Sequence, residues 1–152
     1  MTANKNKEHW LDEFVPYLIY RITNQLNQNL QSRLKRSGVN IARWRVLAVL
    51  KGKGRMNIGQ IVKRTIIKQP TVSRIVNQLE NEGLASREIF NEDSRFVQVL
   101  LTEAGEKAFN EIYPTAARHQ DLALDGFTQR EITTLIDFLE RIQRNISPND
   151  LN

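Results

Sequence analysis

One predicted helix carries a short polar face that is suited to hydrogen bonding rather than to catalysis. Within QPTVSRIVNQLENEGL, residues 69–84, one side offers short polar groups and a single cation: Thr71, Ser73, Arg74, Asn77 and Gln78. Solvated helix faces favour Glu and Lys instead. Arg can pair with both O6 and N7 of guanine, and readout of a DNA major groove needs such groups on the first half of an exposed helix. The face therefore predicts a contact with base edges, the alternative being an ordinary polar surface helix.

The residues around this face mark both ends of the helix. Pro70 suits the first turn because it has no backbone N–H to place, and Gly83 suits a left-handed position just past the end. On the opposite side, apolar residues recur at steps of three and four and must face a core: Val72, Ile75, Val76 and Leu79. Lys68 and Gln69, at the entrance to the helix, join the residues that we expect to contact DNA.

Charge is distributed unevenly along the 152 residues. The net charge is +5, but the segment from Phe14 to Leu79 contains 13 Lys and Arg and no Asp or Glu. From Glu80 onward there are 7 basic and 14 acidic residues. Such a separation indicates a polyanionic partner for the first half of the chain, since chance clustering on solvated helices explains the missing carboxylates poorly.

Composition excludes several other classes of protein. The length suits one domain, and no apolar run approaches a membrane span or a signal peptide, so we expect a cytoplasmic protein without membrane contact. Zero cysteines exclude disulfides and thiolate metal sites, and we expect His9 and His119 to be surface residues rather than metal ligands. No nucleophile elbow, P-loop or dinucleotide fingerprint is present. We therefore expect no enzyme activity, no catalytic residue, no metal and no cofactor.

Hydrophobic periodicity and capping residues predict the remaining elements. Helices are expected over 12–36, 41–51, 57–64, 102–124 and 128–145. Pro16, near the start of the first, is either accommodated there or kinks the entry, and Pro114 could bend the fourth. Thr128 and Glu131 form a capping box. Residues 85–90 and 95–101 read as two strands joined by the polar stretch 91–94. The fold class is mainly α with a small β-hairpin wing, a winged helix-turn-helix flanked by long helices at both ends.

These residues carry a specific family resemblance. Residues 57–84 and the following ASREIFNEDSRFVQVLLTEAG resemble the MarR family of bacterial transcription factors, and the helices outside this region match the layout of that family. The strongest motif is Asp-x-Arg followed six residues later by Leu-Thr-x-x-Gly, which here is Asp93, Arg95, Leu101, Thr102 and Gly105. The resemblance implies a DNA-binding transcriptional regulator, most simply a repressor, and it covers nearly the whole chain.

In that family the wing arginine enters the minor groove and the wing aspartate holds it through a salt bridge. The resemblance assigns these roles to Arg95 and Asp93, and a narrow minor groove does attract an inserted Arg. Two positions depart from the family pattern: Asn91 stands where proline is frequent, and Ser94 stands where a second arginine is frequent. We expect Ser94 to lie at the wing tip and to make weaker contacts there than an arginine would.

The resemblance also implies a homodimer whose terminal helices intertwine, with residues 1–36 and 102–152 dimerising and 37–101 binding a pseudo-palindromic operator. The apolar residues at both ends exceed what a small winged domain needs to cover, although they could instead fill a monomeric core. The predicted dimerisation residues are Trp10, Leu11, Phe14, Leu135, Phe138, Leu139 and Ile142.

A small aromatic or phenolic effector is a further expectation from the resemblance. Three rings could line its pocket and two cations could pair with an anion, although core packing is the simpler role for each ring: Tyr17, Tyr20, Arg43, Trp44 and Arg45. Two rival functions stay open at this point. The first is a winged-helix module for protein assembly, and the second is a small-ligand carrier that does not bind DNA.

Overall fold

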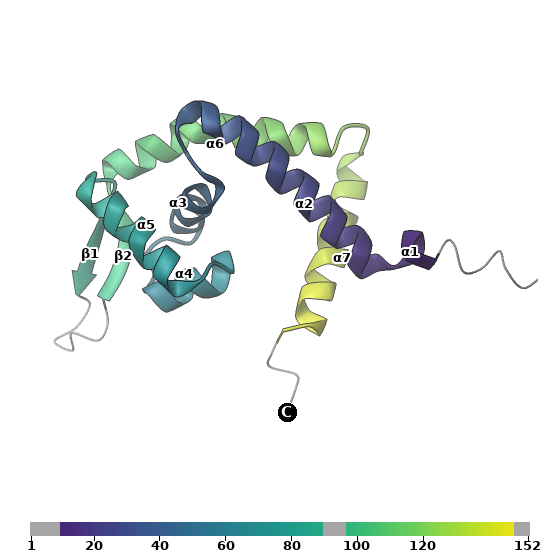
Figure 1. Ribbon diagram of the computed structural model, residues 1–152, viewed down its shortest axis with the longest axis horizontal. Helices are drawn as coiled ribbons and strands as arrows, with labels where there is room; N and C mark the ends of the chain where they lie inside the picture. The colour runs from purple at the N-terminus through teal and green to yellow at the C-terminus, as the bar shows by residue number, and fades with distance from the viewer. Residues whose placement is uncertain (1–9, 90–96, 148–152) are drawn as a thin grey trace, which may run out of the picture. The chain divides into compact units, whose positions relative to one another are not determined.

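The computed structural model describes residues 10–89 and 97–147, and it divides into two compact units, Met1–Ala117 and Arg118–Asn152 (Figure 1). The division falls within helix α6, and each unit is described below by itself. The first unit holds the two sequence segments that the predictions above assigned to base contact and to the hairpin. The domain boundaries at residues 36 and 101 stay a prediction.

The N-terminal helix is broken near its start. A short helix α1 (Trp10–Glu13) is followed by α2 (Val15–Leu34) and the 3-10 helix η1 (Lys35–Ser37), with Phe14 extended between the first two. The helix predicted over 12–36 is interrupted at Phe14, which is one of the two outcomes expected of Pro16, because Pro16 has no N–H to donate to the carbonyl of Asp12 and its ring would clash there. Gly38 ends the segment in the left-handed conformation, at φ 67°.

Three helices follow with the predicted order and nearly the predicted ends: α3 (Ile41–Lys53), α4 (Ile58–Thr65) and α5 (Gln69–Asn81). The side chain of Asn40 caps α3 by accepting from the N–H of Arg43 at 2.8 Å. Asn57 caps α4 in a capping box with Gln60. Helix α5 has Pro70 in its first turn, and Gly83 at φ 72° lies past its end, as predicted.

The turn between α4 and α5 contains an unusual residue. Ile66 has φ 55° and ψ 33°, the left-handed region that branched side chains rarely adopt. Its side chain is 88% exposed, so the conformation is not compensated by burial. This conformation could not be predicted from the residue type, since Gly or Asn would be the usual residue at such a position.

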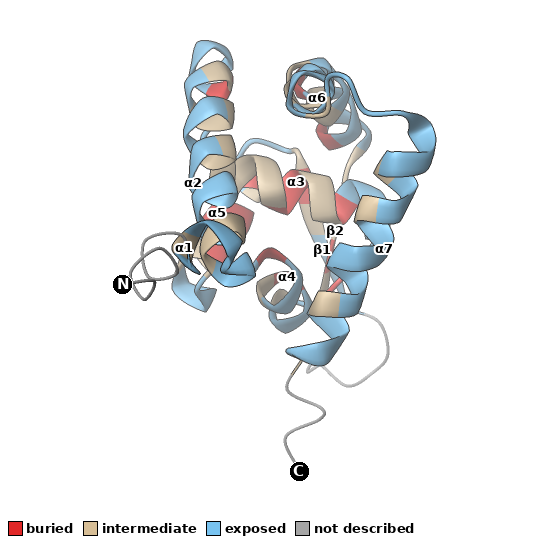
Figure 2. Ribbon diagram, turned by 90° about the vertical axis from the view of Figure 1, so that its right-hand side faces the viewer, coloured by how far each residue is buried: buried red, intermediate tan, exposed pale blue. Residues whose placement is uncertain are grey.

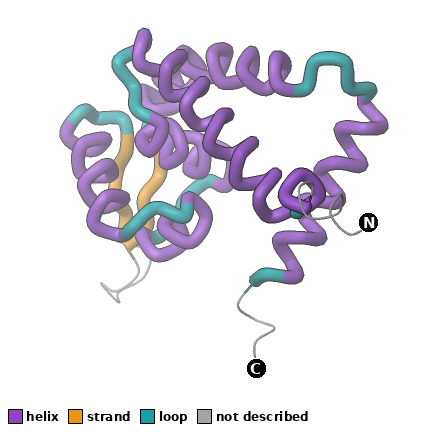
Figure 3. The backbone as a smooth tube through the Cα atoms, turned by 45° about the vertical axis from the view of Figure 1, so that its right-hand side comes forward, coloured by secondary structure: helices purple, strands orange, loops and turns teal. Residues whose placement is uncertain are grey.

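The hairpin pairs β1 (Ala85–Ile89) with β2 (Val97–Leu101) in antiparallel register, from Ala85 opposite Leu101 to Ile89 opposite Val97 (Figure 3, orange strands). Met56, before α4, adds an isolated bridge to Val99, with backbone hydrogen bonds of 3.0 and 2.8 Å. This bridge was not predicted, and it ties the start of α4 to the hairpin. The connection between the strands lies outside the described residues.

The core of the first unit is built where α3, α4, α5 and β2 meet. The α5 stripe predicted to face inward is buried, and it packs with residues from the other elements (Figure 2, red). The largest fully buried side chains are Leu34, Leu47, Ile61, Leu79, Val46, Val72, Val76 and Val99. Because four apolar residues of α5 are fixed in this core, its polar face must point away from it.

Helix α6 (Glu103–Ala123) begins in a tight junction with the end of α5. The Thr102 hydroxyl donates to the carbonyl of Gly83 at 2.6 Å and accepts from the N–H of Gly105 at 3.1 Å. The Thr102 N–H donates to the carbonyl of Leu84 at 3.1 Å. A Cβ on Gly105 would lie 1.8 Å from the Leu84 carbonyl oxygen, so only glycine fits there. The helix continues through Pro114.

The second unit contains the end of α6 and helix α7 (Gln129–Asn145). The predicted capping box is present: Thr128 accepts from the N–H of Glu131 at 3.3 Å, and the Glu131 carboxylate accepts from the N–H of Thr128 at 2.7 Å. The bond from the Thr128 backbone lowers the pKa of Glu131. Within α7, all of whose residues are described, none is buried.

We expect the substitution Gly105→Ala to destabilise the protein by about 3 kcal/mol, since the added methyl would collide with the backbone of Leu84, which a rotamer change cannot relieve. Gly52→Ala is the matched control. It adds the same methyl inside α3, where no atom lies within 4 Å, and should stabilise by roughly 0.5–1 kcal/mol through helix propensity. Denaturant unfolding of both variants measures the difference. Equal effects of the two substitutions would show that the Leu84 contact is not a constraint.

Candidate nucleic-acid interface

Helix α5 presents the predicted polar face on the side away from the core. Arg74, Asn77 and Gln78 are exposed, and Thr71 and Ser73 are half-buried. Lys68 and Gln69 are exposed at the start of the helix. The structure thus brings all seven residues to the accessible side and N-terminal end of one helix. Their contact with DNA stays a prediction.

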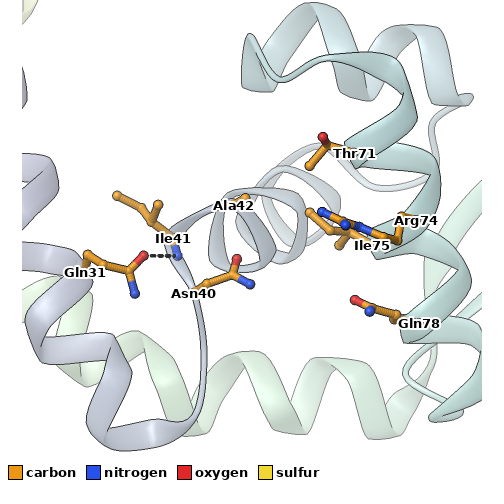
Figure 4. Close-up of a pocket in the computed structure, with 8 residues that line it drawn as sticks. All are labelled: Gln31, Asn40, Ile41, Ala42, Thr71, Arg74, Ile75 and Gln78. Carbon is orange, nitrogen blue, oxygen red and sulfur yellow. Dashed lines mark hydrogen bonds between the residues drawn. The ribbon is translucent and has the colours of Figure 1, made fainter.

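A hollow lies beside this face, between α5 and the start of α3 (Figure 4). Its volume is about 380 Å³, and α5 contributes Thr71, Arg74, Ile75 and Gln78 to its wall. The opposite wall comes from the end of α2 and the start of α3, with Gln31, Asn40, Ile41 and Ala42. The Gln31 side chain accepts from the N–H of Ile41 at 3.0 Å, which holds this wall together. Figure 4 shows the Arg74 side chain extending from α5 toward α3.

Arg87 of β1 connects two residues of α5. Its guanidinium donates to Oδ1 of Asn77 at 2.8 Å, and a second nitrogen forms an ion pair with the carboxylate of Glu80. Sequence reasoning missed both Arg87 and Glu80. A signal was available, because Arg87 lies two positions after the buried Ala85 and shares its side of the strand, which faces α5.

The next acidic residue along the chain is also paired with an arginine. Arg43 donates to Glu82 through two nitrogens, one of them at 2.8 Å. The hydrogen bond from Arg43 lowers the pKa of Glu82, and the same bond raises the pKa of Arg43. Farther on, Lys51 of α3 lies 3.0 Å from the carboxylate of Glu106. Glu82 and Glu106 are therefore paired with cations of the basic segment, and Glu80 is paired with Arg87, which lies outside that segment.

The residues predicted to hold an effector lie in several separate environments. Trp44 stacks on Phe109 at 5.2 Å between ring centroids, and Arg45 donates to Asn27 at 2.8 Å. Tyr17 has Arg21 over its ring, and Tyr20 is exposed. Arg43 lines a second hollow, of about 350 Å³, which reaches from η1 to α6. Neither of these two hollows gathers the five residues, whose role stays a prediction.

The wing residues Asp93, Ser94 and Arg95, together with Asn91, fall outside the described residues, so their predicted roles stay predictions. The hairpin strands on either side are in place. Thr102 and Gly105, which close the motif, form the junction described above.

The predicted dimerisation residues include large apolar side chains that the chain leaves uncovered. Phe138 is 50% exposed and Leu139 is 47% exposed on α7, and Trp10 and Phe14 are exposed around α1, with ring centroids 5.6 Å apart. Leu11, Leu135 and Ile142 are half-buried. Such apolar faces are typical of surfaces that meet another protein.

Within the described ranges, no cluster of His, Asp or Glu could hold a metal ion. None of the helices formed by those residues combines the length and the apolar character needed to span a bilayer.

A helix-turn-helix with a β-hairpin, exposing a polar α5 within a basic segment, defines a winged-helix protein, and comparisons identify its family. The MarR family model matches residues 37–95. A MarR family transcriptional regulator from Silicibacter pomeroyi is 30% identical, with 95% of this chain and 97% of that chain covered and a TM-score of 0.84. The chain belongs to the MarR family of transcriptional regulators.

Two other relatives cover most of the chain. The HTH-type transcriptional repressor IacR of Pseudomonas putida is 27% identical over 135 residues, which are 89% of this chain and 81% of the repressor. BpsR of Bordetella bronchiseptica is 25% identical, with 85% of this chain and 98% of that chain covered and a TM-score of 0.73. DNA binding by BpsR is regulated by 6-hydroxynicotinic acid.

Proposed function

We propose that the protein is a transcriptional repressor that binds a pseudo-palindromic operator as a homodimer and releases it in response to a small aromatic acid. The observation that carries the DNA-binding step is the placement of α5: four buried apolar residues fix the helix, and its polar face is exposed. Membership of a family of regulators supports the same function. Such a repressor acts without catalysis and works in the cytoplasm of a bacterial cell, where the genome lies.

In this proposal α5 enters the major groove, and its exposed side chains divide into two roles. Arg74, Asn77 and Gln78 read base edges, with Thr71 and Ser73 beside them, while Lys68 and Gln69 at the helix start contact phosphate. The positive end of the α5 dipole favours phosphate at that point. We assign minor-groove contact to Arg95, held by Asp93, with Ser94 at the tip of the same wing.

The substitution Arg74→Ala should weaken binding to the operator by about 1–3 kcal/mol and relax the preference for one base pair, because a bidentate contact to guanine is lost. Arg36→Ala, which removes the same charge outside α5, should leave base preference unchanged. Operator fragments are obtained by sequencing the genomic DNA that the purified protein retains, and affinities follow from fluorescence anisotropy at several salt concentrations.

Binding by the wild-type protein should fall steeply with salt, since cations on the protein displace condensed counterions from DNA. An Arg74→Ala variant that weakens operator and random DNA equally would make Arg74 a phosphate contact. A flat salt response, or no retained DNA, would favour the rival functions in protein assembly or ligand transport.

We propose that the terminal segments 1–36 and 102–152 form the dimer and that segment 37–101 binds DNA. The support is the uncovered apolar surface of α1, α2 and α7, where burial against a second chain would remove large side chains from water. Helix α7 in particular is strongly amphipathic in sequence, yet none of its residues is fully buried in the described part of the chain. A dimer would place two α5 helices on successive turns of DNA, about 34 Å apart.

Leu139→Glu should convert the dimer into monomers, because a charge would have to be buried among apolar side chains. Thr133→Glu introduces the same charge at an exposed position on the opposite side of α7 and should leave the dimer intact. Light scattering reports the mass, and circular dichroism confirms that both variants keep their helices. A Leu139→Glu variant that stays dimeric, or a wild-type monomer that still protects a palindrome, would contradict this arrangement.

The proposed effector is a small aromatic acid. A close relative in fold, BpsR, responds to such a compound. In this chain the hollow beside α5 has a volume in the range typical of ligand sites and contains the guanidinium of Arg74. An acid held there would occupy a cation that the proposed DNA contact requires. The separate group of Tyr17, Tyr20, Arg43, Trp44 and Arg45 is the second candidate site.

A titration of 6-hydroxynicotinic acid and salicylate should weaken operator binding about 5- to 150-fold, the range of a typical coupling free energy. The corresponding amides lack the anionic group and should have no effect. Calorimetry and Trp fluorescence measure binding of the acid to the protein without DNA, and two variants distinguish the candidate sites. Arg74→Gln should abolish this binding if the acid occupies the hollow beside α5. Arg45→Gln should abolish it if the acid occupies the second site. No change in either signal at millimolar acid would exclude this ligand class.

A further inference from the structure

The ion pair between β1 and α5 also controls the orientation of a predicted base-reading side chain. Arg87 donates to Asn77 Oδ1 at 2.8 Å while its other nitrogen is paired with Glu80. Asn77 and Glu80 are three residues apart on α5, and therefore on the same side of the helix. The guanidinium is about one-third exposed and the Glu80 side chain is 24% exposed, so the pair is partly shielded from water.

The orientation of the Asn77 amide follows from the chemistry of its partner. A guanidinium carries only donors, so the atom that faces it must be the amide oxygen, and the reversed amide would place two donors against each other. With Oδ1 engaged, Nδ2 is the group of Asn77 that remains to meet a base. Asn77 is thereby presented to the groove as a hydrogen-bond donor.

We propose that Arg87 is a specificity-determining positioning residue, which makes Asn77 favour guanine and disfavour adenine at the base pair it reads. This inference rests on the proposed major-groove role of α5. An asparagine reads adenine by accepting from N6 and donating to N7 at once, and that bidentate contact needs the oxygen that Arg87 holds. Guanine offers two acceptors, O6 and N7, to a donor.

Glu80 holds the other side of the Arg87 guanidinium, and so keeps Arg87 in position to bind Asn77. Without that carboxylate, Arg87 would be drawn to the nearest DNA phosphate and would leave the amide of Asn77 to rotate. The location of Glu80 agrees with this role, since it is the first acidic residue after a segment of 66 residues, Phe14 to Leu79, that has none. A carboxylate so close to the groove is tolerated because Arg87 neutralises it.

The test is selection of binding sites from a random DNA library, with the full-length protein and four variants. Asn77→Ala identifies the position that Asn77 reads, as the one whose base preference is lost. At that position the wild-type protein should prefer guanine to adenine by roughly 2- to 12-fold, the range expected for one neutral hydrogen bond. Arg87→Met removes the donors but keeps an unbranched apolar chain, and it should reverse the preference toward adenine at that position alone.

Two further variants separate orientation from charge and stability. Glu80→Gln combined with Arg87→Met keeps the net charge of the wild-type protein and should show the same shift toward adenine. Arg87→Lys retains a donor for Oδ1 and should retain the guanine preference. If Arg87 merely stabilised the hairpin, its loss would lower the affinity for all DNA sequences together. The base preference at one position would then stay unchanged.

The outcomes distinguish this inference from the function on which it rests. A wild-type protein that enriches no sequence would overturn both. A wild-type protein that enriches an operator, but whose Arg87→Met variant keeps guanine at the Asn77 position, would overturn only the role of Arg87. A wild-type protein that prefers adenine at the Asn77 position would also overturn the role proposed for Arg87.

Discussion

The arrangement of the first unit depends on one close approach between backbones. Gly105 lies so near to the carbonyl of Leu84 that a methyl group would overlap the oxygen, and Thr102 bonds to the carbonyl of Gly83 next to it. Three chain segments meet in this way: the end of α5, the end of β2 and the first turn of α6. The contact holds the C-terminal end of α5 against α6, while the four buried apolar residues of α5 determine which way its polar face points. It also accounts in physical terms for threonine and glycine at the end of the wing motif.

Most of the fold could be predicted from local signals in the sequence. The features that could not be predicted depend on more than those local signals. Pro70, Gly83, Asn57 and the Thr128–Glu131 box marked helix ends correctly because capping is decided within a few residues of sequence. The break at Phe14 was only one of two outcomes expected of Pro16, because a proline near the start of a helix can be accommodated or can kink it, and the local sequence does not decide which. The Met56 bridge and the Arg87 network join residues distant in sequence, and composition carries no information on such partners.

The candidate interface was predictable to a similar extent. The α5 face could be found because burial of one side of a helix determines what the other side shows. Which of its groups donate and which accept was not predictable, since that depends on Arg87 from another element. The proposed effector residues were chosen from ring and charge content, and the structure gives several of them partners of their own, Phe109 for Trp44 and Glu82 for Arg43. The residue type alone does not show that a side chain already packs against, or is bonded to, another residue of the protein.

The ion pairs in the structure change how the separation of charge along the sequence is interpreted. Glu80, Glu82 and Glu106 are each bonded to an arginine or a lysine, so these three carboxylates add little repulsion toward a polyanion. In return, Arg43 and Lys51 are committed within the protein. The number of cations available for phosphate is accordingly smaller than the 13 counted along the segment.

The left-handed Ile66 affects how readily this sequence can change. The conformation costs roughly 1–2 kcal/mol for a residue with a Cβ, and the exposed side chain recovers little of it. Gly or Asn at this position would relieve the strain without any adjustment in the core. The turn before α5 thus holds a reserve of stability that a single substitution can release. After that substitution the protein could accept an equally destabilising change on the neighbouring α5, whose exposed face is the one proposed to contact DNA.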